Sequence, residues 1–145
     1  MSETLRAGVI GVGYLGRFHA RIYNDMPGVE LVGVVDTDRE TADRVAAEYG
    51  TTAYYDPMSL LDAVDVVSVV VPTSLHRQVA VPYLEKGVHM LLEKPVASTL
   101  EMRKLLSMWL TSIPPYYRLV TWNGLMPALW RSLIRSMSRV SSRRI

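Results

Sequence analysis

The sequence contains no cysteine, no long apolar run and no internal repeat. Without cysteine, the 145-residue chain can form neither disulfides nor thiolate metal sites, so we expect a protein of the reducing cytoplasm. No segment approaches the roughly 18 uninterrupted apolar residues of a membrane span, and the polar start Met1–Thr4 does not resemble a signal peptide. The length suits one buried core and is too short for two full domains. The three histidines are too dispersed for a metal site.

Acidic residues are missing from the last part of the chain. Residues 1–101 hold all 14 Asp and Glu against 8 Lys and Arg, a net charge of −6, whereas residues 102–145 hold 8 Lys and Arg and no acid, a net charge of +8. All three tryptophans also lie in this second part. A basic, tryptophan-bearing tail would suit nucleic acid or a membrane surface. We favour a different explanation, given below, and do not expect either partner.

Apolar runs alternate with helical patterns over the first hundred residues. This alternation predicts an α/β fold, a Rossmann-like doubly wound parallel sheet with right-handed crossovers. The β-branched run 66–71 is typical of a parallel strand buried on both faces. Ser74 is expected to cap the third helix. The predicted strands are 5–10, 30–35, 52–55, 66–71 and 88–92, and the predicted helices are 15–25, about 42–49 and 74–86.

The stretch Gly11-x-Gly13-x-x-Gly16 lies between the first predicted strand and the first predicted helix. Gly11 would make the tight turn, Gly13 would let the backbone approach a diphosphate, and Gly16 would let the helix pack closely on the sheet. The first N–H groups of that helix, from Tyr14 and Leu15 onward, would then face the phosphates. These five residues are candidates for cofactor binding, although three glycines alone also suit an ordinary turn.

Asp36 strengthens the dinucleotide interpretation. It ends the second predicted strand about 20 residues beyond the glycines, where a carboxylate can accept both ribose hydroxyls of the adenosine half. A carboxylate would repel a 2′-phosphate, so NAD is the expected cofactor, while the nearby Arg39 leaves NADP as an alternative. Asp36 could instead cap the next helix, a role that Asp38 could also fill.

Two further motifs follow strands of the predicted sheet: Pro72-Thr73-x-x-His76 and Glu93-Lys94-Pro95. Together with the glycines, His19-Ala20 and Asp36, they resemble the N-terminal domain of the Gfo/Idh/MocA oxidoreductases. The resemblance implies NAD(P)-dependent hydride transfer to or from a hydroxyl or carbonyl of a sugar, inositol or sugar nucleotide. It also implies a homo-oligomer.

The resemblance gives individual residues their roles. Lys94 would be catalytic, polarising a carbonyl or sharing in proton transfer, and would lie near the cofactor with Glu93. Thr73 and His76 would bind the cofactor. From the residues alone, Thr73 could simply bond its own turn, and His76 could equally be packed near its helix start. His19 and His89 are expected to be structural.

The family pattern stops near Glu101, and we expect that the family's second α/β domain is missing. We therefore assign residues 1–101 to the NAD(P)-binding domain and residues 102–145 to a basic tail that is not a domain. A shifted reading frame from Glu101 onward permits strings typical of the family, so we expect that a frameshift truncated the protein. Such a tail should have low order, and the sheet should keep an exposed edge, with aggregation as the consequence.

Two functions follow from these observations. In the first, the chain is a dehydrogenase fragment that binds its cofactor without turnover. In the alternative, it is a non-catalytic nucleotide-binding module whose basic tail contacts nucleic acid or a protein partner.

Overall fold

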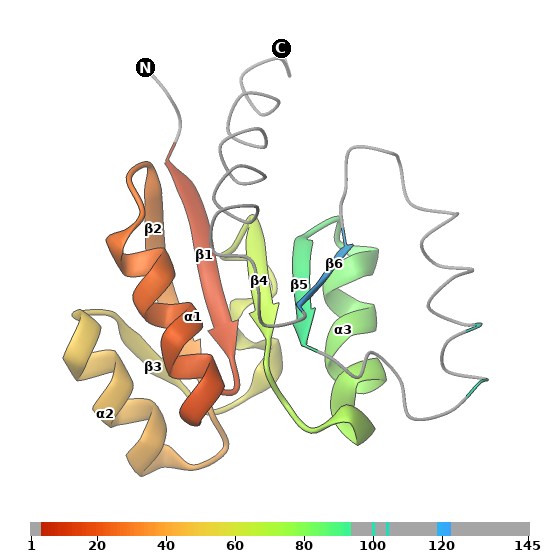
Figure 1. Cartoon of the computed structure of the whole chain (residues 1–145), viewed down its shortest axis with the longest axis horizontal. Coiled ribbons are helices and arrows are strands. Elements are labelled where there is room, and N and C mark those ends of the chain that lie inside the picture. The colour runs from red at the N-terminus through yellow and green to blue at the C-terminus, as the bar shows by residue number, and fades with distance from the viewer. Residues whose placement is uncertain (1–3, 94–99, 101–103, 105–118, 123–145) are drawn as a thin grey trace.

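The protein is built on one parallel sheet flanked by helices (Figure 1). The computed structural model describes residues 4–93, 100, 104 and 119–122. The strand order is β3-β2-β1-β4-β5-β6, and each neighbouring pair is parallel. The strands are β1 (Leu5–Ile10), β2 (Val29–Val35), β3 (Thr52–Tyr54), β4 (Val66–Val69), β5 (His89–Glu93) and β6 (Leu119–Trp122).

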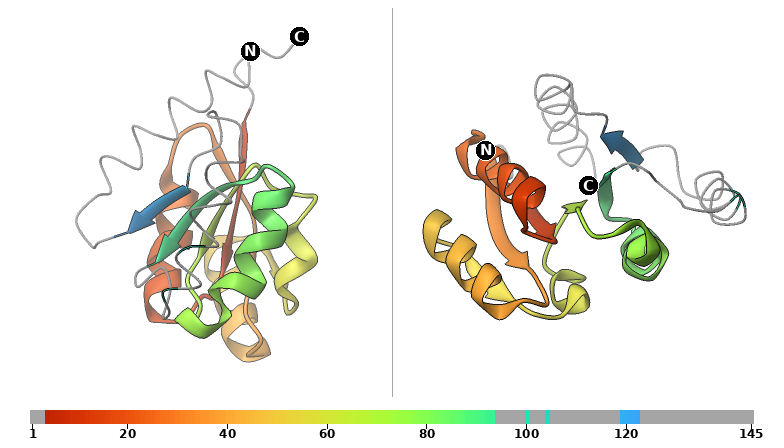
Figure 2. Two further views of the ribbon diagram at one scale, coloured as in Figure 1. Left: turned by 90° about the vertical axis from the view of Figure 1, so that its right-hand side faces the viewer. Right: turned by 60° about the horizontal axis from the view of Figure 1, so that its bottom comes forward.

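Helices cover both faces of the sheet, as a doubly wound fold requires. Figures 1 and 2 show α1 and α2 on one face and α3 on the other. The chain changes face between β3 and β4, which lie on opposite sides of β1 and β2 in the strand order. The helices are α1 (Tyr14–Asp25), α2 (Arg39–Tyr49) and α3 (His76–Glu85), with short 3₁₀ turns η1 (Pro57–Leu60) and η2 (Thr73–Leu75).

Two apolar cores follow from the alternation of side chains along the strands. One core joins the sheet to α1 and α2, and the other joins it to η1 and α3. All four residues of β4 are buried, which confirms the prediction from its β-branched run. Sheet residues of the first core include Ala7, Val9, Val34, Val66 and Leu91; those of the second include Ile10, Val35, Val67, Val69 and Met90.

The third helix begins later than the sequence predicts. Ser74 is not its cap, because α3 begins at His76 after η2, with no side-chain capping bond. Pro72 holds an extended backbone at the start of η2, so the 3₁₀ turn occupies the residues that would have formed the first helical turn. The preceding strand is also shorter than predicted and ends at Val69.

A sixth strand covers the edge of the sheet at β5. We expected this edge to be exposed, but Leu119–Trp122 pairs with Met90–Glu93 in parallel register. The segment Leu-Val-Thr-Trp is rich in residues that favour strands, which explains how it can pair there. The domain boundary at residue 101 and the reading frame of the tail remain predictions.

Candidate functional site

The glycine turn lies at the carboxyl end of β1, where α1 begins (Figure 1). Gly11 has φ +86°, and a Cβ there would lie 2.2 Å from the carbonyl oxygen of Val70. A Cβ on Gly16 would lie 1.7 Å from the carbonyl oxygen of Gly11. Glycine is therefore required at both positions, at Gly11 for the tight turn after β1 and at Gly16 for the close packing of α1 on that turn, as the sequence predicted.

Gly13 is different, because the described part of the protein does not require glycine there. A Cβ at this position would have no described heavy atom within 4 Å, and φ is −65°, which any residue can adopt. Gly13 is the exposed N-cap of α1, with no side-chain capping bond, and is followed by Tyr14 and Leu15, which are 81% and 52% exposed. Within the part of the chain that the structure describes, the start of α1 is thus exposed and has no side-chain cap for its first N–H groups.

Asp36 lies directly against this turn. The N–H of Val12 donates to Asp36 Oδ2 at 3.0 Å, and the N–H of Asp38 donates to Oδ1 at 3.0 Å. Asp38 is the N-cap residue of α2, but its carboxylate accepts the Thr41 hydroxyl at 2.6 Å and caps no N–H. The two aspartates therefore have different roles. Asp36 is fixed beside the glycine turn, whereas Asp38 lies at the start of α2.

The loop after β4 places Thr73 and His76 in different environments. Thr73 is half-buried at the first position of η2. His76 is 1% exposed, and its Nε2 is 2.9 Å from the carbonyl oxygen of Val71, a bond in which the ring N–H donates. The buried His76 ring therefore holds the loop after β4 in place through this bond. Cofactor binding by either residue remains a prediction.

The last two predicted site residues lie at the end of β5. Glu93 is the final residue of that strand. Because the strands are parallel, its backbone lies at the same end of the sheet as the glycine turn and Asp36, namely at the carboxyl ends of the strands. Lys94, the candidate catalytic residue, lies outside the described residues, as does Pro95. The structure thus brings Gly11, Gly13, Gly16 and Asp36 together, and their carboxyl-end placement agrees with the prediction.

Two arrangements near the site were not predicted. The guanidinium of Arg39 lies over the ring of Tyr55, 4.2 Å from its centroid. Beneath α1, the hydroxyl of Ser68 bonds Tyr23 Oη at 2.8 Å and His19 Nδ1 at 3.1 Å. This confirms that His19 is a packed, hydrogen-bonded helix residue. The sequence signal for the second arrangement was a serine within a run of valines.

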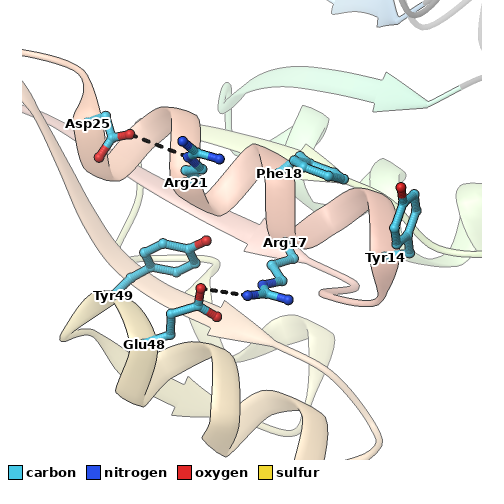
Figure 3. A pocket seen from close by; sticks show the side chains of 7 residues that line it. All are labelled: Tyr14, Arg17, Phe18, Arg21, Asp25, Glu48 and Tyr49. Atoms are coloured by element: carbon cyan, nitrogen blue, oxygen red, sulfur yellow. Dashed lines mark hydrogen bonds and ion pairs between the residues drawn. The ribbon is translucent and has the colours of Figure 1, made fainter.

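A hollow of about 480 Å³ lies between α1 and α2 on the outer surface (Figure 3). Its walls are joined by an ion pair between Arg17 and Glu48 at 2.7 Å. The Arg17 guanidinium lowers the pKa of Glu48 below its ordinary value, chiefly through this hydrogen bond. Both side chains are substantially exposed, so the pair contributes little stability. The hollow lies between the outer surfaces of α1 and α2 and is not part of the candidate site at the glycine turn.

Within the described ranges, no helix combines the length and apolar character needed to cross a membrane. In that part of the chain, no group of three or more His, Asp or Glu side chains is arranged to hold a metal ion.

Comparison with known families decides how this site is classified. Residues 5–109 match the Gfo/Idh/MocA model, described as an oxidoreductase family with an NAD-binding Rossmann fold. The chain belongs to this family. The match confirms the resemblance deduced from the glycines, Asp36 and the Glu-Lys-Pro motif, together with the predicted fold class and cofactor type.

Individual relatives are sugar, inositol and sugar-nucleotide dehydrogenases. The chain is 50% identical over 91 residues to UDP-N-acetylglucosamine 3-dehydrogenase of Acidithiobacillus ferrooxidans, covering 63% of this chain and 28% of that protein. A structure of that enzyme superposes with a TM-score of 0.69 at 44% identity, covering 74% of this chain and 34% of the other. Myo-inositol dehydrogenase of Lactobacillus casei, in complex with NAD(H) and myo-inositol, gives 0.74 at 27% identity, covering 92% and 42%. The chain thus spans about 28–42% of the length of these relatives.

Proposed function

We propose that this chain binds NAD across the carboxyl ends of its strands. The diphosphate lies against the first N–H groups of α1, and the adenosine ribose lies against Asp36. The observation that carries the proposal is the open position at Gly13 beside an anchored carboxylate. Packing of the described residues explains Gly11 and Gly16 but not Gly13, whereas a diphosphate in contact with the backbone would explain it.

The carboxylate of Asp36 is suited to a ribose. It already accepts two backbone N–H groups, which fix its orientation, and a carboxylate has about four acceptor sites in all. The remaining sites can accept the 2′- and 3′-hydroxyls of the adenosine ribose. Its negative charge opposes a 2′-phosphate, so NAD is favoured over NADP.

The activity follows from the family. NAD supplies the hydride acceptor for oxidation of an alcohol, and the named relatives act on UDP-N-acetylglucosamine and inositols. We propose the same class of sugar-like substrate, with Lys94 polarising the reacting oxygen. A homo-oligomer and a cytoplasmic location belong to the same proposal. The chain spans about a third of the length of these relatives, and the binding of the cofactor is the part of the proposal that its own residues carry.

A fluorescence titration of NADH and NADPH with the wild type and Asp36→Asn tests the proposal. The wild type should bind NADH more tightly than NADPH. Asp36→Asn should bind NADH about tenfold more weakly, because one ribose acceptor is lost, and should discriminate less against NADPH. Thermal unfolding of the variant shows whether it is folded. If the ratio of NADH affinity to NADPH affinity were the same in the wild type and in the variant, the role of Asp36 would be contradicted.

A further inference from the structure

Four exposed side chains form one line along the outer surface of α1 (Figure 3). They lie four, three and four residues apart, which is the spacing of side chains on one side of a helix. We call this line the outer stripe; its members, which also border the hollow between α1 and α2, are Tyr14, Phe18, Arg21 and Asp25. The proposed NAD site uses the backbone N–H groups at the start of α1 and not the side chains of the outer stripe.

The first half of the outer stripe is aromatic. The rings of Tyr14 and Phe18 meet edge to face, with their centroids 5.3 Å apart. Tyr14 is 81% exposed and Phe18 is 46% exposed. Large aromatic side chains contribute strongly to binding when an interface buries them. Two neighbouring exposed rings on a helix surface are therefore more typical of a contact surface than of a solvated helix face.

The second half of the outer stripe is charged. Arg21 Nε lies 3.8 Å from Asp25 Oδ2, and the two side chains are 65% and 58% exposed. A long ion pair in solvent contributes little stability, so both groups can change partners at little cost. Arg17, on the same helix, is instead held by Glu48 at 2.7 Å. The guanidinium of Arg21 is therefore less tightly bound within the chain than that of Arg17.

The two halves of the outer stripe complement each other when a second copy of α1 runs antiparallel to the first. The spacing of four, three and four residues is the same from either end, so Phe18 then faces Arg21 of the second copy. Tyr14 faces Asp25 of the second copy in the same register. The first pair makes a cation–π contact, and in the second a phenol hydroxyl donates to a carboxylate. Two-fold symmetry repeats both contacts, as in an isologous interface.

We propose that the outer stripe is a dimer interface, in which two copies of this chain pack their first helices antiparallel. The ring half of each stripe covers the charged half of the other. The helix has 12 residues and is about 18 Å long, so the contact is small and the dimer is weak, with a Kd above about 10 µM. The inference rests on the homo-oligomer of the proposed function, to which it gives a surface, and not on cofactor binding.

Sedimentation velocity of the full chain, at roughly 10 to 500 µM, tests the interface. Phe18→Arg places a cation opposite Arg21 of the second copy and should raise the Kd of the dimer at least about tenfold, because the repulsion occurs twice. Adding Arg21→Glu to Phe18→Arg puts opposite charges across the two-fold axis and should restore most of the dimer. Arg77→Glu, a charge reversal at an exposed position of α3 on the other face of the sheet, should dimerise as the wild type does.

Introduced cysteines test the register, because the natural chain has none. Residues 14 and 25 lie at opposite ends of the outer stripe, about 16 Å apart along the helix axis. Tyr14→Cys and Asp25→Cys should therefore form a disulfide-linked dimer under mild oxidation when the two variants are mixed, and much less of it when each is oxidised alone. Equal cross-linking in the mixed and separate samples would contradict the antiparallel register.

The other outcomes separate this interface from the proposed homo-oligomer. A dimer that Phe18→Arg leaves intact would refute the interface alone, because the copies would then associate through another surface. A double variant that stays dissociated would contradict the pairing of Phe18 with Arg21. A wild type that remains monomeric at every concentration would refute both the interface and the homo-oligomer for this chain, whereas the NADH titration would still decide cofactor binding.

Discussion

Ser68 links α1 to the centre of the sheet through a hydroxyl in a strand of valines. Its Oγ bonds both Tyr23 Oη and His19 Nδ1, and the serine is completely buried. Removing this hydroxyl deletes two buried hydrogen bonds, which together contribute about 1–3 kcal/mol. We therefore expect Ser68→Ala to lower the free energy of unfolding by about this amount, measured by urea denaturation.

Ser74→Ala is the matched control for this substitution. Ser74 is exposed, and the structure gives it no capping role at the start of α3. The change should stay within about 0.5 kcal/mol of the wild type. A loss comparable to that of a helix cap at Ser74, or no loss at Ser68, would contradict these assignments.

Residue patterns predicted the backbone positions of the site better than its side-chain contacts. Gly11, Gly16 and Asp36 could be found because a strand, turn and helix impose a fixed spacing on them. The stack of Arg39 on Tyr55 could not be predicted from the sequence, because it depends on how α2 lies over the end of β3. The bond from His76 to the Val71 carbonyl also depends on the path of the loop. From the sequence alone, His76 could either bind the cofactor or pack near the start of its helix.

At the level of elements, α3 is fastened to η1 through Tyr83. The buried Tyr83 hydroxyl donates to the carbonyl of Pro57, and burial raises the pKa of Tyr83 well above its ordinary value. With a folded pKa above the unfolded one, this group contributes its full stability below the unfolded pKa of about 10. That contribution is lost progressively as the pH rises above this value.

A pH series on the wild type and Tyr83→Phe measures this contribution. At neutral pH the variant should be less stable by about 1 kcal/mol, because the Pro57 carbonyl loses its donor. Above about pH 10 the wild type should lose stability faster than the variant, so the two free energies of unfolding converge. Parallel curves across the alkaline range would show that Tyr83 titrates normally in the folded state.

The order of the elements was predictable, and their ends were less so. Strand and helix periodicities gave the alternation, and Gly50, with φ +64°, ends α2 as expected from the sequence. The predicted start of α3 was wrong. Serine is a residue that often caps helices, but here Pro72 and η2 determine where the helix begins. Strand β6 was missed, because its partner strand lies far back in the sequence.

For the molecule as a whole, β6 determines how the sheet ends. Removing residues 102–145 deletes Leu119–Trp122 and uncovers the backbone N–H and C=O groups along β5. An uncovered edge strand is a template for association, so the shortened chain should have a lower melting temperature and form larger species in light scattering. If the tail is an out-of-frame addition without structural effect, the shortened and full chains should instead behave alike.

The central claim is that NAD lies against the open start of α1, and Gly13→Ala tests it most directly by calorimetry. The added methyl would meet no described atom of the protein, and the preference of an N-cap for glycine over alanine is worth only about 1 kcal/mol, so the variant should stay folded with a slightly lower melting temperature, whereas the methyl would occupy the path of the diphosphate. We predict measurable heat and a single NAD site in the wild type, and a Kd at least about tenfold higher in Gly13→Ala. No heat from the folded wild type, or the same Kd for both proteins, would contradict the account.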